Sequence, residues 1–400
     1  MVSTTPPSPE PAAPAAVPEP MSVHMALASA GDARSPHYWS GSPYYMAQAL
    51  EPRLSQLSYI SPVQERMVST VGKAARLRQR LTGQRTMPAS SWFAAKRNAQ
   101  VIRRWLSETP VDMLYAPAGS ALIAALDLDI PVIYSSDATV HLMIDYYGRF
   151  SDLTSGALRE AEELERAAID QAAILTYPTR WAANSAIEHY GADPDKVFIM
   201  PYGANMSTLP DRATALAPRA PGPLRLVFVG VDWERKGGAI AVEALRALND
   251  RGGETHLTIV GCVPPEDVPR DNLTVHPFLS KNDPAELAQL AALYAGSDFL
   301  FVPTRAECYG VVWCEAAAHG LPSISTATGG VPDVITDGVT GHTLPPEAGG
   351  ADYADLIAEI AADPARLEAM KVSARDDFET RLDWSIWARD LVAEVGRLAR

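Results

Sequence analysis

Two adjacent cations precede a glycine pair in the segment FVGVDWERKGG, which opens as a β-rich run. The run ends at Gly230, Arg235 and Lys236 follow it, and Gly237 and Gly238 then open a helical pattern. Backbone amides at a helix start bind phosphate groups, and positive side chains stabilise the charge that grows on a leaving diphosphate. A charged surface turn is the alternative interpretation. The residue types and their order make this segment a candidate diphosphate site.

Two carboxylates lie eight positions apart in a later segment, FVPTRAECYGVVWCEAAAHG. Glu307 follows a β-rich run, and we expect a helix that begins near Gly310 and contains Glu315. Eight residues span a little over two helical turns, so Glu315 lies deeper on the side of Glu307. The pair can bind sugar hydroxyls and a ribose diol, with the amides of Gly310, Val311 and Val312 facing the anion between them. An ordinary helix start, whose dipole favours an early Glu, is the alternative.

A paired glycine turn forms the third segment, TATGGVPDVI. Gly329 and Gly330 follow a strand-like run and precede a helical pattern, so they offer bare backbone to phosphate or sugar oxygens. One such turn alone is weak evidence for binding. Three of them at successive strand ends indicate a common site, because ligands of open α/β sheets bind beyond the carboxyl ends of the strands.

Two series of short apolar runs, each run followed by a helical pattern, position these turns. Runs such as DMLYAP and FLFVPT are typical of strands buried on both faces of a parallel sheet. The alternation predicts an α/β protein with two doubly wound, Rossmann-like domains. The predicted parts are a disordered Pro- and Ala-rich tail (1–21), an N-terminal domain (22–207), a linker (208–223), a C-terminal domain (224–379) and a C-terminal amphipathic helix (380–400).

Composition narrows the function classes. The formal charge of −14 argues against nucleic acid as a partner. Cys262, Cys308 and Cys314 form no CxxC pair, so we expect neither a disulfide framework nor a metal site. No apolar run reaches the roughly 20 residues of a membrane-spanning helix. The first residues lack the basic and apolar regions of a signal peptide, so we expect a cytoplasmic protein.

One basic segment departs from the acidic average. From Arg66 to Ser107 the sequence has ten Lys or Arg residues and no Asp or Glu. Apolar side chains recur in it at helical spacing, at Met67, Val71, Ala74, Leu77 and Leu81. Such a stripe can lie on an anionic membrane surface or bind an anionic acceptor. Two ordinary amphipathic helices with their apolar sides in the core are the alternative.

The order of the three segments resembles glycosyltransferase family 4, whose members are retaining enzymes of the GT-B fold with a central cleft between two Rossmann-like domains. The matching motifs are Gly230…Arg235-Lys236-Gly237, Glu307-CYGVVWC-Glu315 and Gly329-Gly330-Val331-Pro332. The stretches WSGSPYYMAQALE (39–51) and TRWAANSAIEHYGADPDKVFIMPYGAN (179–205) are also similar to the family. The resemblance covers roughly residue 22 to the C terminus.

The resemblance implies a role for each matching residue. Arg235 and Lys236 bind the donor diphosphate in place of a metal ion. Glu315 holds the ribose hydroxyls, and Glu307 contacts the donor sugar near its C3 or C4 hydroxyl. Gly41, in a loop of the first domain, approaches the phosphates when the cleft closes. The family pattern also implies that the C-terminal helix crosses onto the first, acceptor-binding domain.

This chain departs from the family pattern at two places. Many relatives have Arg directly after the strand glycine, where this chain has Val231, and we infer that Arg235 replaces it. Many relatives also have His at a strand end in the acceptor half, where this chain has Asp137, with His141 four residues later. Asp137 is the preferred candidate for a polar contact with the reacting sugar, and His141 is the second. A structural role for either residue is the alternative.

The predicted reaction transfers a hexose from a UDP- or GDP-sugar to a lipid or glycan acceptor in cell-envelope, glycolipid or polysaccharide synthesis, with retention of configuration. The resemblance implies front-side displacement, in which the departing phosphate oxygen takes the acceptor's proton without metal or cofactor. If the basic segment binds lipid, the protein is peripheral on the inner face of the membrane. The alternatives are a soluble transferase or synthase acting on a small sugar or sugar phosphate, and an inert nucleotide-sugar binding protein.

Overall fold

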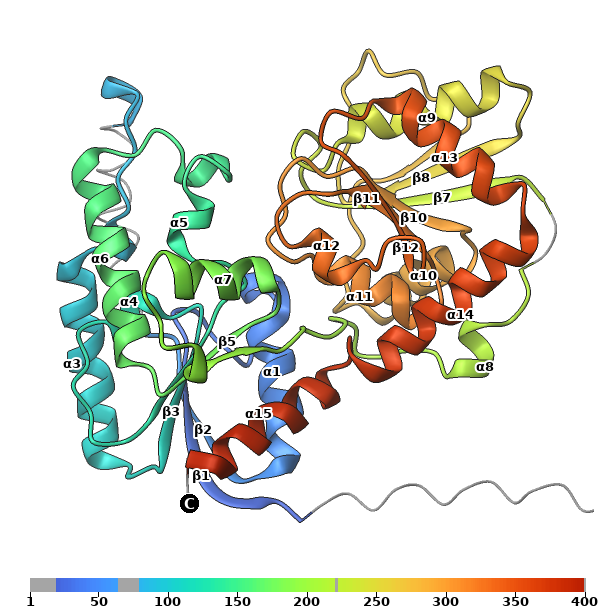
Figure 1. The fold of residues 1–400 in the computed structure, drawn as a ribbon. Coiled ribbons are helices and arrows are strands. Elements are labelled where there is room, and N and C mark those ends of the chain that lie inside the picture. Colours follow the sequence, from blue (N-terminus) through green and yellow to red (C-terminus); the bar gives the residue numbers. More distant parts are fainter. Residues whose placement is uncertain (1–18, 64–78, 220–221, 399–400) are drawn as a thin grey trace, which may run out of the picture.

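The computed structural model describes residues 19–63, 79–219 and 222–398. In this part of the chain the strands form two parallel sheets of six strands each, and helices cover both faces of each sheet (Figure 1). This arrangement confirms the predicted α/β class with two doubly wound domains. Because all strands of a sheet are parallel, their carboxyl ends share one edge, and the loops at that edge can form a common site.

The first sheet has the strand order β2-β1-β3-β4-β5-β6. Its strands are β1 (Met21–Ala28), β2 (Leu54–Ile60), β3 (Met113–Pro117), β4 (Val132–Ser135), β5 (Ile174–Tyr177) and β6 (Val197–Ile199). Every residue of β3, β4 and β5 is buried, as expected for central strands covered on both faces. The edge strand β2 instead buries only its first and last residues, Leu54 and Ile60.

Three helices of the first domain begin at a side chain that accepts a free amide of the first turn. Thr154 accepts the Ala157 amide at 3.2 Å, and Ser91 accepts the Ala94 amide at 3.3 Å. The α-helices are α1 (Ser42–Leu50), α3 (Trp92–Glu108), α4 (Ser120–Ile123), α5 (Val140–Met143), α6 (Ser155–Gln171) and α7 (Arg180–Glu188). Short 3₁₀ turns occur at η1 (Tyr38–Gly41), η2 (Glu51–Arg53), η3 (Pro88–Ser90), η4 (Gly148–Phe150) and η5 (Pro194–Lys196).

The second sheet has the strand order β12-β11-β10-β7-β8-β9. Its strands are β7 (Leu224–Val229), β8 (Thr255–Val260), β9 (Leu273–His276), β10 (Phe299–Val302), β11 (Ser323–Thr326) and β12 (Gly341–Leu344). The helices of this half are α8 (Arg212–Ala215), α9 (Gly238–Asp250), α10 (Pro284–Ala295), α11 (Val311–Ala318), α12 (Val331–Val334), α13 (Gly350–Ala361), α14 (Pro364–Thr380) and α15 (Trp384–Leu398).

The last helix, α15, leaves the second domain and lies against α1 of the first (Figure 1). The ring of Trp384 stacks on Tyr202, with 5.4 Å between the centroids, and Arg53 donates to the Ser385 carbonyl at 3.0 Å. Gly203 makes this approach possible, because a Cβ there would lie 2.4 Å from the Trp384 amide nitrogen. The C-terminal helix therefore ties the two domains together.

The segment boundaries in the structure differ from the predicted ones in two places. β1 begins at Met21, so it takes in the last residue of the predicted tail, of which residues 1–18 lie outside the described residues. The predicted linker, 208–223, contains the short helix α8, which Asp211 caps by accepting the Thr214 amide at 2.7 Å.

The basic segment is described only in part, because residues 64–78, with Met67, Val71, Ala74 and Leu77, lie outside the described residues. In the described part, α3 buries Ala94, Ala95, Asn98, Ala99 and Ile102. Its basic residues Lys96, Arg97, Arg103 and Arg104 are exposed, as are Leu81 and Phe93. No helix among the described residues is long and apolar enough to cross a membrane.

Candidate active site

A cavity of about 220 Å³ lies between the two domains. It is lined by the loop that precedes α1, the loops after β4 and β6, the turn after β7, and the segment from β10 to α11. The predicted site residues that line it are Asp137, Gly230, Arg235, Lys236, Glu307, Gly310, Val311, Val312 and Glu315. The fold thus brings residues from both domains to one place at the sheet edges.

The turn after β7 presents Arg235 and Lys236 to the cavity. Gly237 allows this turn, because its φ is +75° and a Cβ would lie 2.0 Å from the Pro303 carbonyl oxygen. A Cβ at Gly230 would meet the Lys236 side chain at 2.8 Å. The two glycines therefore let the turn pack closely against the end of β10, with both cations directed inward.

Both cations contact the carboxylate of Glu307. The Lys236 ammonium and the Arg235 guanidinium, the latter at 3.2 Å, donate to the same Glu307 oxygen, Oε2. Burial by itself would raise the pKa of Glu307, but the charges of Lys236 and then Arg235 outweigh it, and the pKa lies below its ordinary value. Glu307 is therefore ionised at neutral pH, and it meets both cations in a largely buried site.

Glu315 is fully buried on α11, which begins after Gly310. Gly310 has a φ of +85°, a conformation that favours glycine. The Tyr294 hydroxyl donates to one oxygen of Glu315 at 3.0 Å, and the Lys281 ammonium donates to the other. The sequence analysis did not include Lys281, because no local pattern connects a loop lysine with a carboxylate 34 residues later.

Two adjacent tyrosines of the first domain, Tyr146 and Tyr147, also contact Glu307. The Tyr147 hydroxyl accepts the Cys308 amide at 3.1 Å and donates to Glu307 Oε1 at 3.3 Å. The Tyr146 hydroxyl accepts the Glu307 amide at 2.9 Å and lies 2.8 Å from the Thr328 hydroxyl. Sequence reasoning missed this pair, although a Tyr-Tyr dipeptide after the strand-end Asp137 was a usable signal. The tyrosines join the two domains at the predicted donor-sugar carboxylate.

The two acceptor-side candidates, Asp137 and His141, lie in different places. Asp137 lines the cavity, and burial, followed by the charge of Glu307, raises its pKa to about 6. His141 is not among the residues that line the cavity; its ring stacks on His189 with 3.5 Å between the centroids. The structure therefore brings Asp137, but not His141, to the cavity that holds the other predicted site residues.

Three of the predicted glycines lie beside the cavity without lining it. Gly41 has a φ of +89° and precedes α1, while its neighbours Trp39 and Ser40 line the cavity. Gly329 and Gly330 pack behind the β10–α11 loop, where Cβ atoms would lie 2.2 and 2.0 Å from the carbonyl oxygens of residues 307 and 308. The Gly330 amide donates to the Glu307 carbonyl at 3.1 Å, so these glycines support the loop that carries Glu307.

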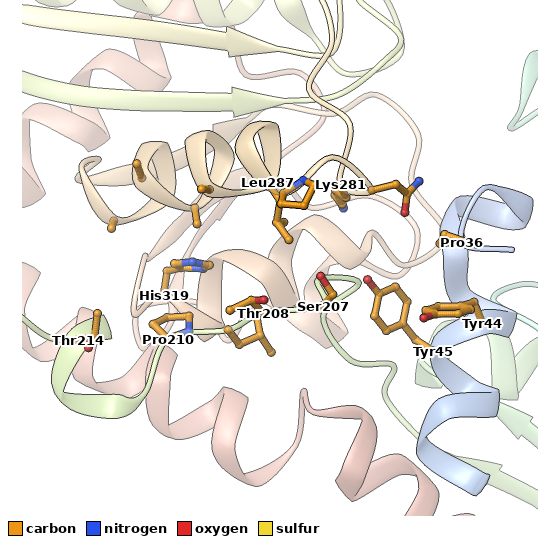
Figure 2. Close-up of a pocket in the computed structure, with 17 residues that line it drawn as sticks. Pro36, Tyr44, Tyr45, Ser207, Thr208, Pro210, Thr214, Lys281, Leu287 and His319 are labelled. Atoms are coloured by element: carbon orange, nitrogen blue, oxygen red, sulfur yellow. The ribbon is translucent and has the colours of Figure 1, made fainter. Parts of the chain in front are cut away.

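A second, larger cavity of about 700 Å³ adjoins the first. Its apolar wall comes from α10, including Leu287, and residues 207–210, at the start of the linker, form another side. Figure 2 shows Tyr44 and Tyr45 extending from α1 towards this space. Lys281 is the residue that lines both cavities, so the Lys281–Glu315 ion pair stands between them.

Comparison with known proteins agrees with this architecture. Residues 44–208 match the family described as Glycosyltransferase Family 4, and residues 223–363 match the family described as Glycosyl transferases group 1. The chain belongs to glycosyltransferase family 4. Among curated relatives, the D-inositol 3-phosphate glycosyltransferases of Corynebacterium glutamicum and Corynebacterium aurimucosum are each 29% identical, over 66% of this chain. The matches span 65% of each relative, slightly less than two thirds.

Solved structures share the fold at low sequence identity. The sucrose-phosphate synthase from Thermosynechococcus elongatus has a TM-score of 0.64 at 14% identity, covering 94% of this chain and 99% of that one. The Anabaena protein HepE in complex with UDP has a TM-score of 0.63 at 16% identity, covering 94% and 100%. These likenesses confirm the two-domain GT-B fold.

Proposed function

We propose that this member of family 4 is a retaining glycosyltransferase that uses a nucleoside diphosphate sugar as donor. The observation that carries the proposal is the convergence of two cations and two carboxylates in one cavity between the domains. Arg235 and Lys236 neutralise the diphosphate, Glu307 binds hydroxyls of the donor sugar, and Glu315 binds the ribose diol. The names of solved relatives support such a donor, because HepE is described in complex with UDP and with UDP-glucose.

The nucleoside extends from the first cavity towards the second. A volume of about 220 Å³ is below the roughly 300–1,000 Å³ of sites that enclose ligands of this size. Beyond Lys281 lie about 700 Å³ more, with the rings of Tyr44 and Tyr45 available to stack on a base. The ammonium of Lys281 then shifts from Glu315 as the ribose hydroxyls bind. UDP and GDP are both candidate donor nucleotides.

The chemical step is front-side displacement at the sugar C1. The bond from C1 to the diphosphate oxygen breaks, the acceptor oxygen bonds to C1 on the same face, and the acceptor's proton passes to the departing phosphate oxygen. Positive charge at Arg235 and Lys236 stabilises the diphosphate as its charge grows. Asp137, whose pKa is about 6, is largely ionised at neutral pH and accepts a hydrogen bond from a hydroxyl of the reacting sugar or acceptor. Metal is not required for this chemistry.

The acceptor is either a lipid or glycan hydroxyl, or a hydroxyl of a small phosphorylated polyol. The second candidate is supported by the relatives, which are named for D-inositol 3-phosphate. It is also supported by Arg149, whose exposed cation lies close enough to the cavity to act on the pKa of Asp137. A phosphate near Arg149 would bring its neighbouring hydroxyl towards the donor sugar. Lipid-bound acceptors instead require the basic segment to bind the membrane surface.

The test combines nucleotide binding with donor turnover. Calorimetry with UDP and GDP identifies the nucleotide, and radiolabelled UDP-glucose or GDP-mannose is then followed in EDTA with inositol phosphate or with lipid extract as acceptor. Glu315→Gln should weaken nucleotide binding about 10- to 150-fold, because a hydrogen bond to a charged group contributes about 1.5–3 kcal/mol. Glu254→Gln, at an exposed carboxylate, is the control. Unchanged binding in Glu315→Gln, or no turnover of any donor, would exclude the proposal.

A further inference from the structure

Three side chains of the first domain meet outside the candidate active site. His141 belongs to α5, Glu162 to α6, and His189 directly follows α7. The His141 Nδ1 lies 3.7 Å from one Glu162 oxygen, and the His189 Nε2 lies 3.4 Å from the other. Figure 1 shows these three helices in green, with α6 farther from the second domain than α5 and α7. Each side chain is partly exposed, so solutes reach the cluster.

The donor set of this cluster fits a transition-metal ion. One ligand atom from each residue lies within 4.8 Å of the other two. Around a tetrahedral zinc ion with bonds of about 2.0–2.1 Å, ligand atoms are about 3.4 Å apart, close to the nitrogen–oxygen distances of 3.4 and 3.7 Å in the cluster. The stacked imidazole rings of His141 and His189 would turn apart to direct both nitrogens at one ion. Two imidazoles and one carboxylate suit Zn²⁺, Ni²⁺ or Cu²⁺, whereas Mg²⁺ and Ca²⁺ prefer oxygen ligands alone.

A neighbouring tyrosine holds the carboxylate of this cluster in place. The Tyr190 hydroxyl donates to Glu162 at 2.6 Å and accepts the backbone amide of His141 at 3.0 Å. The guanidinium of Arg166, a nearby cation, donates to the backbone carbonyl of Tyr190 at 2.7 Å. Hydrogen bonds that fix a ligand before the metal arrives are typical of built metal sites, and their removal weakens binding about 10- to 100-fold.

We propose that His141, Glu162 and His189 bind one zinc-class divalent ion, with water in the remaining coordination positions. The ion ties α5 to α6 and to the end of α7. The residues that follow α5 include Tyr146 and Tyr147, so the ion also anchors the segment that contacts Glu307 across the domains. The site is structural, takes no part in the transfer step, and does not depend on the function proposed above.

Zinc titration of the untagged full-length protein tests the proposal. Calorimetry with ZnCl₂ should give one site in the parent, and MgCl₂ should give none. His141→Ala, His189→Ala and Glu162→Gln should each weaken zinc binding at least tenfold. His256→Ala, on β8 of the second domain, is the matched control and should leave binding unchanged. Thermal melts with and without ZnCl₂ show that each variant folds and whether zinc still raises its melting temperature.

Tyr190→Phe separates a built site from chance binding by surface histidines. It keeps all three ligands but removes the hydrogen bond to Glu162, so zinc binding should fall about 10- to 100-fold. Parent-like zinc affinity in Tyr190→Phe overturns the proposal. So does parent-like affinity in the His141→Ala/His189→Ala double variant. Absence of zinc binding by the parent at about 100 µM protein also overturns it, because structural zinc sites bind with about 10–16 kcal/mol, far more tightly than this concentration requires.

Discussion

The buried contact between Lys236 and Glu307 predicts a pH-dependent loss of stability when the lysine is removed. Their side chains are 9% and 10% exposed, so neither charge is well hydrated. Lys236→Met keeps most of the side-chain volume but removes the ammonium. Glu307 then remains buried with Arg235 as its one cation, at 3.2 Å.

The size of the effect follows from this partial compensation. Removing one partner of a buried ion pair costs about 3–5 kcal/mol. Because the Arg235 guanidinium still contacts the same oxygen, we expect the lower end, about 3 kcal/mol. For a domain of 150–250 residues, each kcal/mol lowers the melting temperature by about 2–4 °C. The transition of the second domain should therefore fall by about 6–12 °C at pH 7.

The sign of the pH dependence follows from the pKa of Glu307. That pKa lies below its unfolded value of 4.5, so the stabilisation is present above pH 4.5 and is lost as the pH falls through the folded pKa. The difference in melting temperature between parent and Lys236→Met should be full at pH 7. It should shrink as the pH falls below 4.5 towards the folded pKa, because the carboxyl group then takes up a proton and no longer needs a cation.

Calorimetric melts at pH 7.5, 5.5 and 4 measure this effect, with exposed Lys196→Met as the control. The double variant with Glu307→Gln should recover much of the loss, because it leaves no buried carboxylate without its partner. The reasoning is refuted if the Lys236→Met and Glu307→Gln losses simply add. A difference that stays constant from pH 7.5 to pH 4 would refute it equally.

Three further predictions test other contacts. Tyr147→Phe should slow donor turnover about tenfold but change UDP affinity less than about threefold, because the hydroxyl contacts the sugar-side carboxylate; equal losses in both would contradict this. Burial raises the pKa of Glu165 to about 7, so the free energy of unfolding of the parent should fall by about 3 kcal/mol as the pH rises from 4.5 through 7. Thermal melts of Glu165→Gln at pH 5 and pH 8 should not show this decrease. Gly203→Ala should lower the free energy of unfolding by about 1–3 kcal/mol and detach α15, because the added methyl group would clash with Trp384. Gly156→Ala, which has open space around it, should do neither, and protease cleavage before α15 measures the difference.

The sequence was informative where structure depends on local pattern. Apolar runs predicted the central strands, because strands buried on both faces carry little else than apolar residues. The edge strands β2 and β12 carry no such apolar run, because LSQLSYI is interrupted by polar residues and GHTL is short. The convergence of Arg235 with Glu307 followed from the rule that parallel strands present their loops at one edge.

Contacts between segments far apart in the sequence could not be predicted from local patterns. The pairing of Lys281 with Glu315, and of Tyr147 with Glu307, depends on how loops from separate strands and separate domains meet. His141 was interpreted as an acceptor contact because of its distance from a strand end. In the structure the short helix α5 turns its side chain to Glu162 and His189 instead. Distance along the chain does not determine the side from which a side chain leaves a helix.

The ion pairs of the site bear on how it binds a donor. In the proposed binding mode, a diphosphate at Arg235 and Lys236 competes with Glu307, and a ribose at Glu315 competes with Lys281, because each protein group is already paired. The net affinity is therefore the difference between ligand contacts and the protein contacts that they replace, which is smaller than either sum. Exchange also keeps every buried charge compensated throughout binding. Once a diphosphate is bound by both cations in this mode, Glu307 keeps its contact with Tyr147 and its second oxygen can accept a sugar hydroxyl. The proposal therefore couples binding of the leaving group to positioning of the sugar.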